Sequence, residues 1–216
     1  MTNEIENSRP RLLAWLDLET TGLDPKEDGI LELAFRLTEF DYPYADADVP
    51  IVAGQYLLRN AARQRLLDGG CSSFIENMHA KSGLTDALKD ESRTTSESTM
   101  NDDLLRLSAS WPGVGVDKSK LTDEERVALK DSMVVLAGNS VDFDRGFLRV
   151  HFPDFAARVS HRVFDVSALS MAARSLGMPR LPKSERHRAS MDVEESILQA
   201  RMISKYFAHL SVRPSR

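Results

Sequence analysis

Apolar and polar residues alternate along the first quarter of the chain in short runs that end at turn residues. Residues 12–18 form an apolar run that stops at the Thr-Thr-Gly of 20–22, and residues 30–40 alternate between apolar and polar positions. Residues 50–58 form a third such segment. Runs of this length between turn residues are typical of strands. The pattern therefore predicts an antiparallel meander over residues 12–58.

The rest of the chain alternates helical patterns with short apolar runs. Helices are expected over residues 60–67, 72–78, 98–107, 121–130, 142–150, 167–176 and 190–209. Two further strands are expected at 133–138 and 162–166, whereas 89–99 and 111–120 are polar or rich in glycine and should be loops. The order of elements predicts an α/β domain with a mixed five-stranded sheet flanked by helices.

The composition is that of a globular chain. Its 216 residues favour one domain, which we place at 11–210 between polar tails at 1–10 and 211–216, with a variable, loop-rich insert at 89–131. Apolar residues make up 42% and charged residues 28%, which excludes a collagen, a disulfide scaffold and a wholly disordered chain. A net charge of −5 argues against a protein that coats long nucleic acid by charge alone.

The single cysteine and the polar N-terminus indicate the kind of cellular compartment in which the protein works. Cys71 is the sole cysteine, so it has no intramolecular disulfide partner, and no Cys/His cluster indicates zinc. The first eleven residues are polar and lack the apolar stretch of a signal peptide. No apolar run approaches the roughly 18 residues that a spanning helix needs. We therefore expect a reducing, aqueous compartment, the cytoplasm, and no membrane partner.

The sharpest chemical signal is the pair Asp17 and Glu19 at the end of the first predicted strand. Side chains two residues apart on a strand point to the same face, so the two carboxylates project together. Burying two like charges side by side is costly unless a cation neutralises them, and carboxylate oxygens bind Mg²⁺ or Mn²⁺. The alternative is that one of the two carboxylates is simply solvated at the strand end.

Two later segments carry further candidates. Asp144 follows a buried strand in the first turns of a helix, and Asp142 is its nearer rival. His187 lies in a loop before the last helix, which Asp192 opens. Each has a plain alternative, because acids at a helix start are stabilised by the helix dipole and a loop histidine is commonly solvated.

In order and local context, these segments resemble the DEDDh 3′–5′ exonuclease superfamily, and one branch closely, the oligoribonucleases. The similar segments are LLAWLDLETTGLDP (12–25), MHAKSGL (78–84), AGNSVDFDRGFL (137–148), FDVSAL (164–169) and HRASMDVEES (187–196). The resemblance covers about residues 12–209 and implies a ribonuclease H-like fold.

The resemblance also implies a reaction. Asp17, Glu19, Asp144 and Asp192 would hold two divalent metal ions, Mg²⁺ or Mn²⁺, and His187 would be the general base. Two such ions can activate water and stabilise the leaving oxygen of an in-line displacement. A histidine accepts a proton readily near neutral pH. The implied activity is 3′–5′ degradation of short RNA oligonucleotides, down to dinucleotides, to mononucleotides.

The same resemblance suggests how substrate is held. Leu23 matches a leucine that wedges between bases, and His79 matches a histidine near the scissile nucleotide. Ser140, Arg162 and Ser167 match a cap around the 5′ phosphate, with Arg162 supplied by the other subunit of a homodimer. The alternatives are a turn-packing leucine, serines that act as helix N-caps, and an arginine in a surface ion pair.

Three residues depart from the family pattern. His161 stands where a tyrosine is usual, Thr20 where a methionine is common, and Phe74 where a tryptophan is expected, although phenylalanine can still stack on a base. Residues 112–131 are also longer than in the family. These departures keep a second interpretation open, a broader exonuclease acting on single-stranded DNA or RNA 3′ ends. A non-enzymatic partner-binding domain is a third, which the five occupied catalytic positions oppose.

Overall fold

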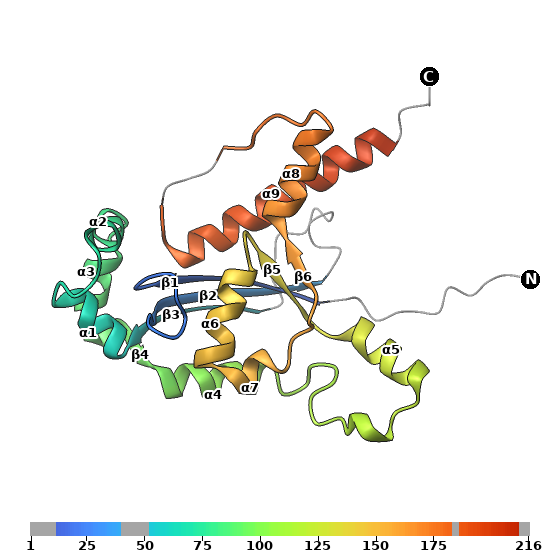
Figure 1. The fold of residues 1–216 in the computed structure, drawn as a ribbon, viewed down its shortest axis with the longest axis horizontal. Helices are drawn as coiled ribbons and strands as arrows, with labels where there is room; N and C mark the ends of the chain where they lie inside the picture. Colours follow the sequence, from blue (N-terminus) through green and yellow to red (C-terminus); the bar gives the residue numbers. More distant parts are fainter. Residues whose placement is uncertain (1–11, 40–51, 183–185, 212–216) are drawn as a thin grey trace, which may run out of the picture.

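A six-stranded mixed sheet is the framework of the molecule (Figure 1). The computed structural model describes residues 12–39, 52–182 and 186–211. The strands are β1 (Leu12–Thr20), β2 (Ile30–Glu39), β3 (Val52–Arg59), β4 (Thr94–Ser96), β5 (Val135–Gly138) and β6 (Val163–Asp165), in the spatial order β4-β3-β2-β1-β5-β6. β1, β2 and β3 pair antiparallel, which confirms the predicted meander, and β5 and β6 add in parallel beyond β1.

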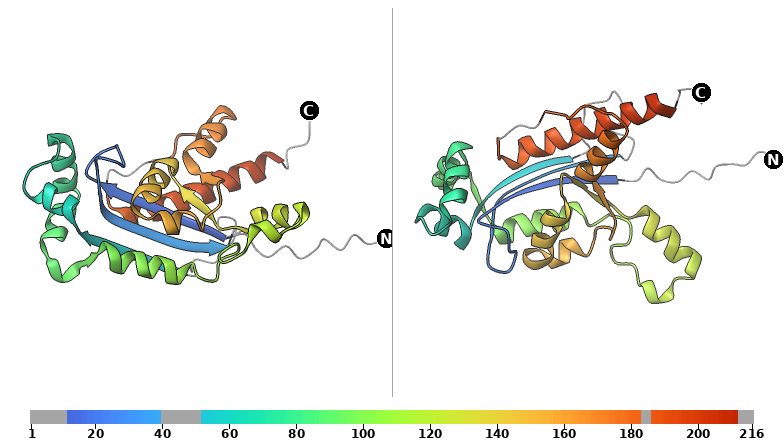
Figure 2. Two further views of the ribbon diagram at one scale, coloured as in Figure 1. Left: turned by 60° about the horizontal axis from the view of Figure 1, so that its bottom comes forward. Right: turned by 45° about the horizontal axis from the view of Figure 1, so that its top comes forward.

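Helices cover both faces of this sheet. In chain order they are α1 (Ala61–Leu67), α2 (Ser73–Lys81), α3 (Leu84–Lys89), α4 (Glu97–Leu107), α5 (Asp123–Ser132), α6 (Asp142–His151), α7 (Pro153–Ala156), α8 (Val166–Ser175) and α9 (Ala189–Ser211). α8 and α9 lie on one face, and α4, α6 and α7 lie on the other (Figures 1 and 2). α1, α2 and α3 gather at one end of the sheet, and α5 projects from the opposite end.

The alternation of side chains along β1 decides which layer each residue meets. Leu13 and Trp15 pack in the apolar cluster beneath α8 and α9, whereas Leu16 and Leu18 pack in the cluster on the α4 and α6 side. All four are buried. Because successive strand residues point to opposite faces, the odd-numbered residues that follow Trp15 also face α9. The acidic pair at the end of β1 is therefore directed at the start of the last helix.

The prediction of a five-stranded sheet was wrong, because β4 adds a sixth strand at the edge. Residues 89–99 were expected to be a loop, yet they hold a short 3-10 turn, Glu91–Arg93, then β4, and then the start of α4. β4 is only Thr-Thr-Ser and pairs in parallel with the end of β3. A three-residue polar edge strand has no apolar alternation, so its existence depends on the neighbouring strand rather than on its own sequence.

The helix predicted over 121–130 was confirmed as α5, whereas the loop predicted at 111–120 ends in a 3-10 turn, Lys118–Lys120, and α3 and α7 were not predicted. α5 begins after Thr122, whose side chain accepts the Glu125 N–H while the Glu125 carboxylate accepts the Thr122 N–H. The tail at 1–10 and nearly all of the tail at 211–216 lie outside the described residues. Within the described ranges, no helix is both long and apolar enough to cross a membrane.

Candidate active site

The five residues with predicted catalytic roles line one pocket of about 250 Å³ at an edge of the sheet. They come from three parts of the chain and are listed here with their positions: Asp17 and Glu19 on β1, Asp144 on α6, His187 before α9, and Asp192 in the first turn of α9. Asp142, the rival of Asp144, is exposed and does not line this pocket.

The parallel pairing of β1 with β5 explains this convergence. Trp15 lies opposite Ala137, so both strands run to the same edge, where α6 begins. Sites in α/β sheets gather beyond the carboxyl ends of strands. Asp144 is buried, and its Oδ1 accepts the Leu18 backbone N–H at 3.0 Å. One hydrogen bond thus fixes a helix carboxylate beside the strand that carries the acidic pair.

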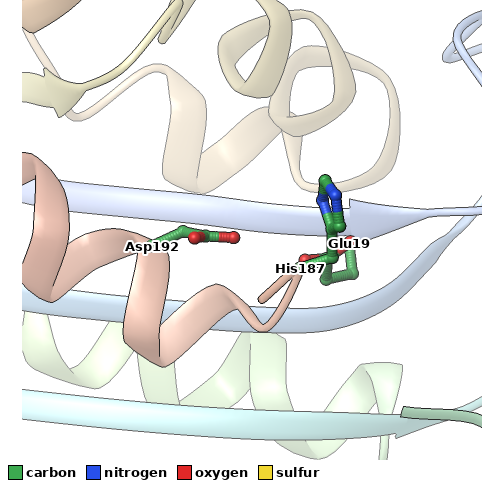
Figure 3. Close-up of side chains that lie close together, drawn as sticks. All are labelled: Glu19, His187 and Asp192. Carbon is green, nitrogen blue, oxygen red and sulfur yellow. The ribbon is translucent and has the colours of Figure 1, made fainter. Parts of the chain in front are cut away.

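Glu19, His187 and Asp192 form a close cluster within this pocket. Each offers one possible ligand atom, and these atoms lie within 4.8 Å of one another (Figure 3). His187 has a backbone φ of 46°, in the left-handed region that residues with a Cβ seldom adopt. The loop histidine is therefore held in a specific backbone conformation over the end of β1.

Burial and mutual repulsion raise the pKa values of the carboxyl groups. Burial raises the pKa of Glu19 to about 8, with the Asp192 charge adding to the shift. Burial also raises the pKa of Asp144 to about 8, against the opposing effect of the Leu18 N–H bond. The pKa of Asp17 is raised by burial and then by the neighbouring Asp144 and Glu19 charges. Carboxylates gathered at this cost fit a site for hard divalent cations, which take oxygen ligands.

The residues expected to wedge or stack against bases, Leu23 and Phe74, which we call the rim, are exposed. Leu23, in the turn between β1 and β2, is 80% exposed, and Phe74 on α2 is 72% exposed. Phe74, Asn77 and Lys81 line a second pocket of about 520 Å³ that also includes His187. Because His187 lines both pockets, the second pocket adjoins the acidic one.

Thr20 and His79 lie beneath the surface. The Thr20 hydroxyl donates to the Gly22 carbonyl at 2.7 Å, and the His79 ring Nε2 lies 2.9 Å from the Thr20 carbonyl oxygen. His79 is fully buried, and its Nδ1, which has no hydrogen-bond partner, is 3.8 Å from Glu19 Oε2. Burial lowers the pKa of His79. In this structure both residues support the turn that follows the acidic pair.

The interpretation of the two serines as helix caps was wrong. Ser140 has a left-handed φ of 54°, and Val141 occupies the N-cap position of α6. α8 is capped by Asp165, whose Oδ1 accepts the Ala168 N–H at 3.0 Å. Ser140 and Ser167 instead meet, with their hydroxyl oxygens 3.2 Å apart. A hydroxyl from the turn after β5 and one from the first turn of α8 therefore lie together, and Ser140 lines the acidic pocket.

Sequence reasoning missed the role of Asn139, between Gly138 and Ser140. Its amide nitrogen donates to Ser196 Oγ at 2.8 Å and to Gln199 Oε1 at 3.2 Å, and its Oδ1 accepts the Ser167 hydroxyl at 3.2 Å. These bonds join the end of β5 to α8 and α9. The Gly-Asn-Ser segment was the available signal, but the partners are more than 25 residues away in sequence.

His161 and Arg162 lie away from the acidic pocket, and neither lines it. Both are exposed, and Arg162 Nη1 lies 2.6 Å from Asp131 Oδ1. The surface ion pair left open as an alternative for Arg162 is therefore present. Its partner belongs to α5, within the segment that departs in length from the family pattern.

Comparisons with known proteins agree with this geometry. No family model matches the sequence. The chain is 32% identical over 202 residues to an oligoribonuclease of Thiobacillus denitrificans, covering 92% of this chain and 96% of that protein. It is 31% identical over 196 residues to a mitochondrial oligoribonuclease of Mus musculus, covering 88% and 70%. The zinc-bound E. coli ExoI–ssDNA complex matches with a TM-score of 0.56 at 14% identity, over 94% of this chain and 43% of that one, which confirms the ribonuclease H-like α/β fold.

Proposed function

The chain belongs to the oligoribonuclease family, and from that premise we propose that its acidic pocket is the centre at which short RNA strands are hydrolysed from the 3′ end. It is a 3′–5′ exoribonuclease that hydrolyses the phosphodiester bonds of short oligonucleotides. The observation that carries the assignment of the centre is the convergence of four carboxylates and a histidine in one pocket at the ends of β1 and β5.

Two divalent cations, Mg²⁺ or Mn²⁺, would bind to the carboxylates of four residues. These residues are Asp17, Glu19, Asp144 and Asp192. When bound, such ions neutralise the carboxylates and stabilise charge on the attacking and leaving oxygens. The raised pKa values of Glu19 and Asp144 support this role, because the Arg188 charge near Glu19 and the Leu18 N–H on Asp144 only partly offset the effect of burial. Asp144 keeps its orientation through the Leu18 N–H, so one oxygen is held by the fold.

His187 would take the proton of the attacking water on a ring nitrogen. Its place beside Glu19 and Asp192 supports this role, because a general base must reach the nucleophile at the cation site. His187 is itself partly exposed, which leaves a path for the proton to solvent. The base would then release the proton to water before the next turnover.

The rim would hold the two terminal nucleotides. Leu23 would insert between the bases, and Phe74 would stack on one of them, with Thr20 and His79 shaping the turn beneath. The hydroxyl groups of Ser140 and Ser167 would donate hydrogen bonds to the 5′ phosphate. The 3.2 Å distance between their oxygens supports this, because both hydroxyls can reach one phosphate group.

A homodimer would complete this cap. Arg162, with His161 beside it, would bind the 5′ phosphate of substrate held in the partner subunit. This requires the guanidinium to break its ion pair with Asp131. We also propose that residues 11–210 form one exonuclease domain with a variable segment at 89–131. The lone Cys71 fits a reducing compartment, the cytoplasm.

A substrate length series tests the proposed function. RNA of two, five and about twenty nucleotides and a matching DNA series would be digested with Mg²⁺ or Mn²⁺ beside the Asp17→Ala variant. We expect the dinucleotide to be cleared fastest and the variant to be inactive on every substrate. Faster loss of long strands or of DNA would instead favour a general exonuclease, and full activity of the variant would contradict the assignment of the pocket.

A further inference from the structure

A buried ion pair beside the acidic pocket has no part in the mechanism above. Glu32 on β2 is fully buried, and its carboxylate accepts hydrogen bonds from Arg188 Nε and Nη2, each at 3.0 Å. Its Oε2 also accepts the Ala189 backbone N–H at 3.2 Å, and the Gln55 amide donates to Oε1. A carboxylate at this depth persists only where such donors surround it.

The register of the sheet places this pair next to the chemistry. Glu32 is the cross-strand partner of Glu19 in the β1–β2 ladder, so both side chains lie on the face that α9 covers. Arg188 and Ala189, which bind the Glu32 carboxylate, are the two residues that directly follow His187. Three of the hydrogen bonds to Glu32 therefore fix the chain immediately after the histidine.

The backbone of His187 needs such support. Its φ of 46° is strained for a residue with a Cβ, and within the described ranges only Ser140 shares this feature among the non-glycine residues. Strained conformations persist where the surrounding structure holds them, and they cluster at functional sites. The bonds to Arg188 and Ala189 come from outside the loop, so the loop alone does not set the position of the histidine.

We propose that Glu32 is a positioning residue for hydrolysis, which holds His187 beside Glu19 and Asp192 through Arg188 and Ala189. The inference rests on the proposed function, since it assumes that His187 moves a proton. Glu32 itself touches neither substrate nor cation. The paired bonds from a planar guanidinium define an orientation that the single ammonium of a lysine cannot reproduce, so Arg188 is specifically required.

Two substitutions test the proposal, Glu32→Gln and Arg188→Lys, assayed on a diribonucleotide at saturating Mn²⁺. We expect kcat to fall about 10–100-fold in each, with KM changed less than about twofold, because misplacing a catalytic group by about an ångström has effects of that size. Arg188 is partly exposed and its lysine variant keeps the charge, so it remains informative if Glu32→Gln does not fold. The melting temperature of each variant is measured in parallel.

A matched control comes from the same two elements. Arg36 on β2 pairs with Glu194 on α9, further along the interface and away from the pocket. If the Glu32 pair only docks α9 on the sheet, then Arg36→Gln should lower kcat as Arg188→Lys does. We expect Arg36→Gln to leave kcat within about twofold of the wild-type value, and equal losses in the two variants would overturn the proposal.

A double-mutant cycle separates this inference from the proposed function. In a His187→Ala background, Glu32→Gln should lower the residual rate less than about twofold, because residues that act through one group are not additive. The same large loss in both backgrounds would overturn the positioning role, as would a loss expressed in KM alone. Full activity of His187→Ala would instead overturn the proposed function, and this inference with it.

Discussion

The floor and the rim of the site are built in opposite ways. The floor consists of carboxylates on a buried strand and on two helix starts, held by backbone hydrogen bonds and by the packing of β1 beneath α9. The rim consists of Leu23 in a turn and Phe74 on a short helix, both largely exposed. The carboxylates of the floor repel one another, whereas the rim exposes apolar side chains to water. The difference suggests that the floor sets the chemistry and the rim sets which strand end is bound.

The largest effect is expected at the floor. Asp17→Ala should lower turnover by at least about 1,000-fold, because it removes a carboxylate from the proposed cation site. Its metal-free melting temperature should equal or exceed that of the wild type, since the change relieves repulsion among Asp17, Glu19 and Asp144. Activity assays and thermal unfolding in EDTA measure the two quantities. A melting temperature many degrees lower would show that Asp17 supports the fold instead.

The pH dependence of stability should also single out the floor. Glu19 and Asp144 have pKa values near 8 in the metal-free fold, above those of an unfolded chain, so the folded state binds more protons between about pH 4.5 and 8. The contribution of these two groups to the free energy of unfolding is therefore largest at the low end of this pH range. It is lost as the pH rises through 8. We expect the melting temperature in EDTA to fall by roughly 5 °C or more between pH 5 and 8.5.

Two controls accompany that measurement. Saturating Mn²⁺ should abolish most of the fall, because a bound cation favours the ionised carboxylates. Asp144→Asn should show a smaller fall in EDTA, since one of the titrating groups is gone. A decline that neither Mn²⁺ nor the substitution reduces would place its origin outside the pocket.

At the rim, Phe74→Ala should weaken binding with less effect on the chemical step. Base–aromatic stacking contributes about 1–3 kcal/mol per base, so KM for a diribonucleotide should rise about tenfold while kcat changes less than about threefold. Phe74→Trp should restore KM, and Val127→Ala, at another exposed apolar position, on α5, should change neither constant. A loss confined to kcat would move Phe74 from binding to catalysis.

The smallest effect is expected at Arg162, outside both pockets. Arg162→Ala should slow dinucleotide cleavage several-fold more than cleavage of a pentanucleotide if it contributes to a phosphate cap. Asp131→Ala is the matched control, because it removes the same ion pair but leaves the guanidinium in place. Equal losses in the two variants would mean that the pair with Asp131 is the whole role of Arg162.

The sequence was most informative where local geometry is sufficient. A period of two on β1 predicts that Asp17 and Glu19 share a face, and the structure has them lining one pocket. The capping box of α5 and the three-stranded meander are equally local features. β4 escaped prediction because a polar edge strand of three residues is stabilised by β3 and not by its own pattern.

The substrate residues show the limit more clearly. Ser140 and Ser167 had the sequence context of helix caps, but Val141 and Asp165 occupy those positions, and the two hydroxyls meet across 27 residues of chain. The sequence did not predict that the buried ring of His79 lies under the turn that follows β1, beside Glu19. Neither arrangement leaves a local signature, because each depends on how a helix packs against a turn that is distant in sequence.

The amino-acid sequence by itself determined the family, the antiparallel meander and the acidic residues that line the pocket. Only the tertiary structure decided that Glu32 opposes Glu19, that Arg188 binds it, and that His187 is thereby held over the pocket. The reason is physical. Alternation and capping act over a few residues, whereas a buried charge finds its partner wherever the packed layers bring a complementary donor within reach.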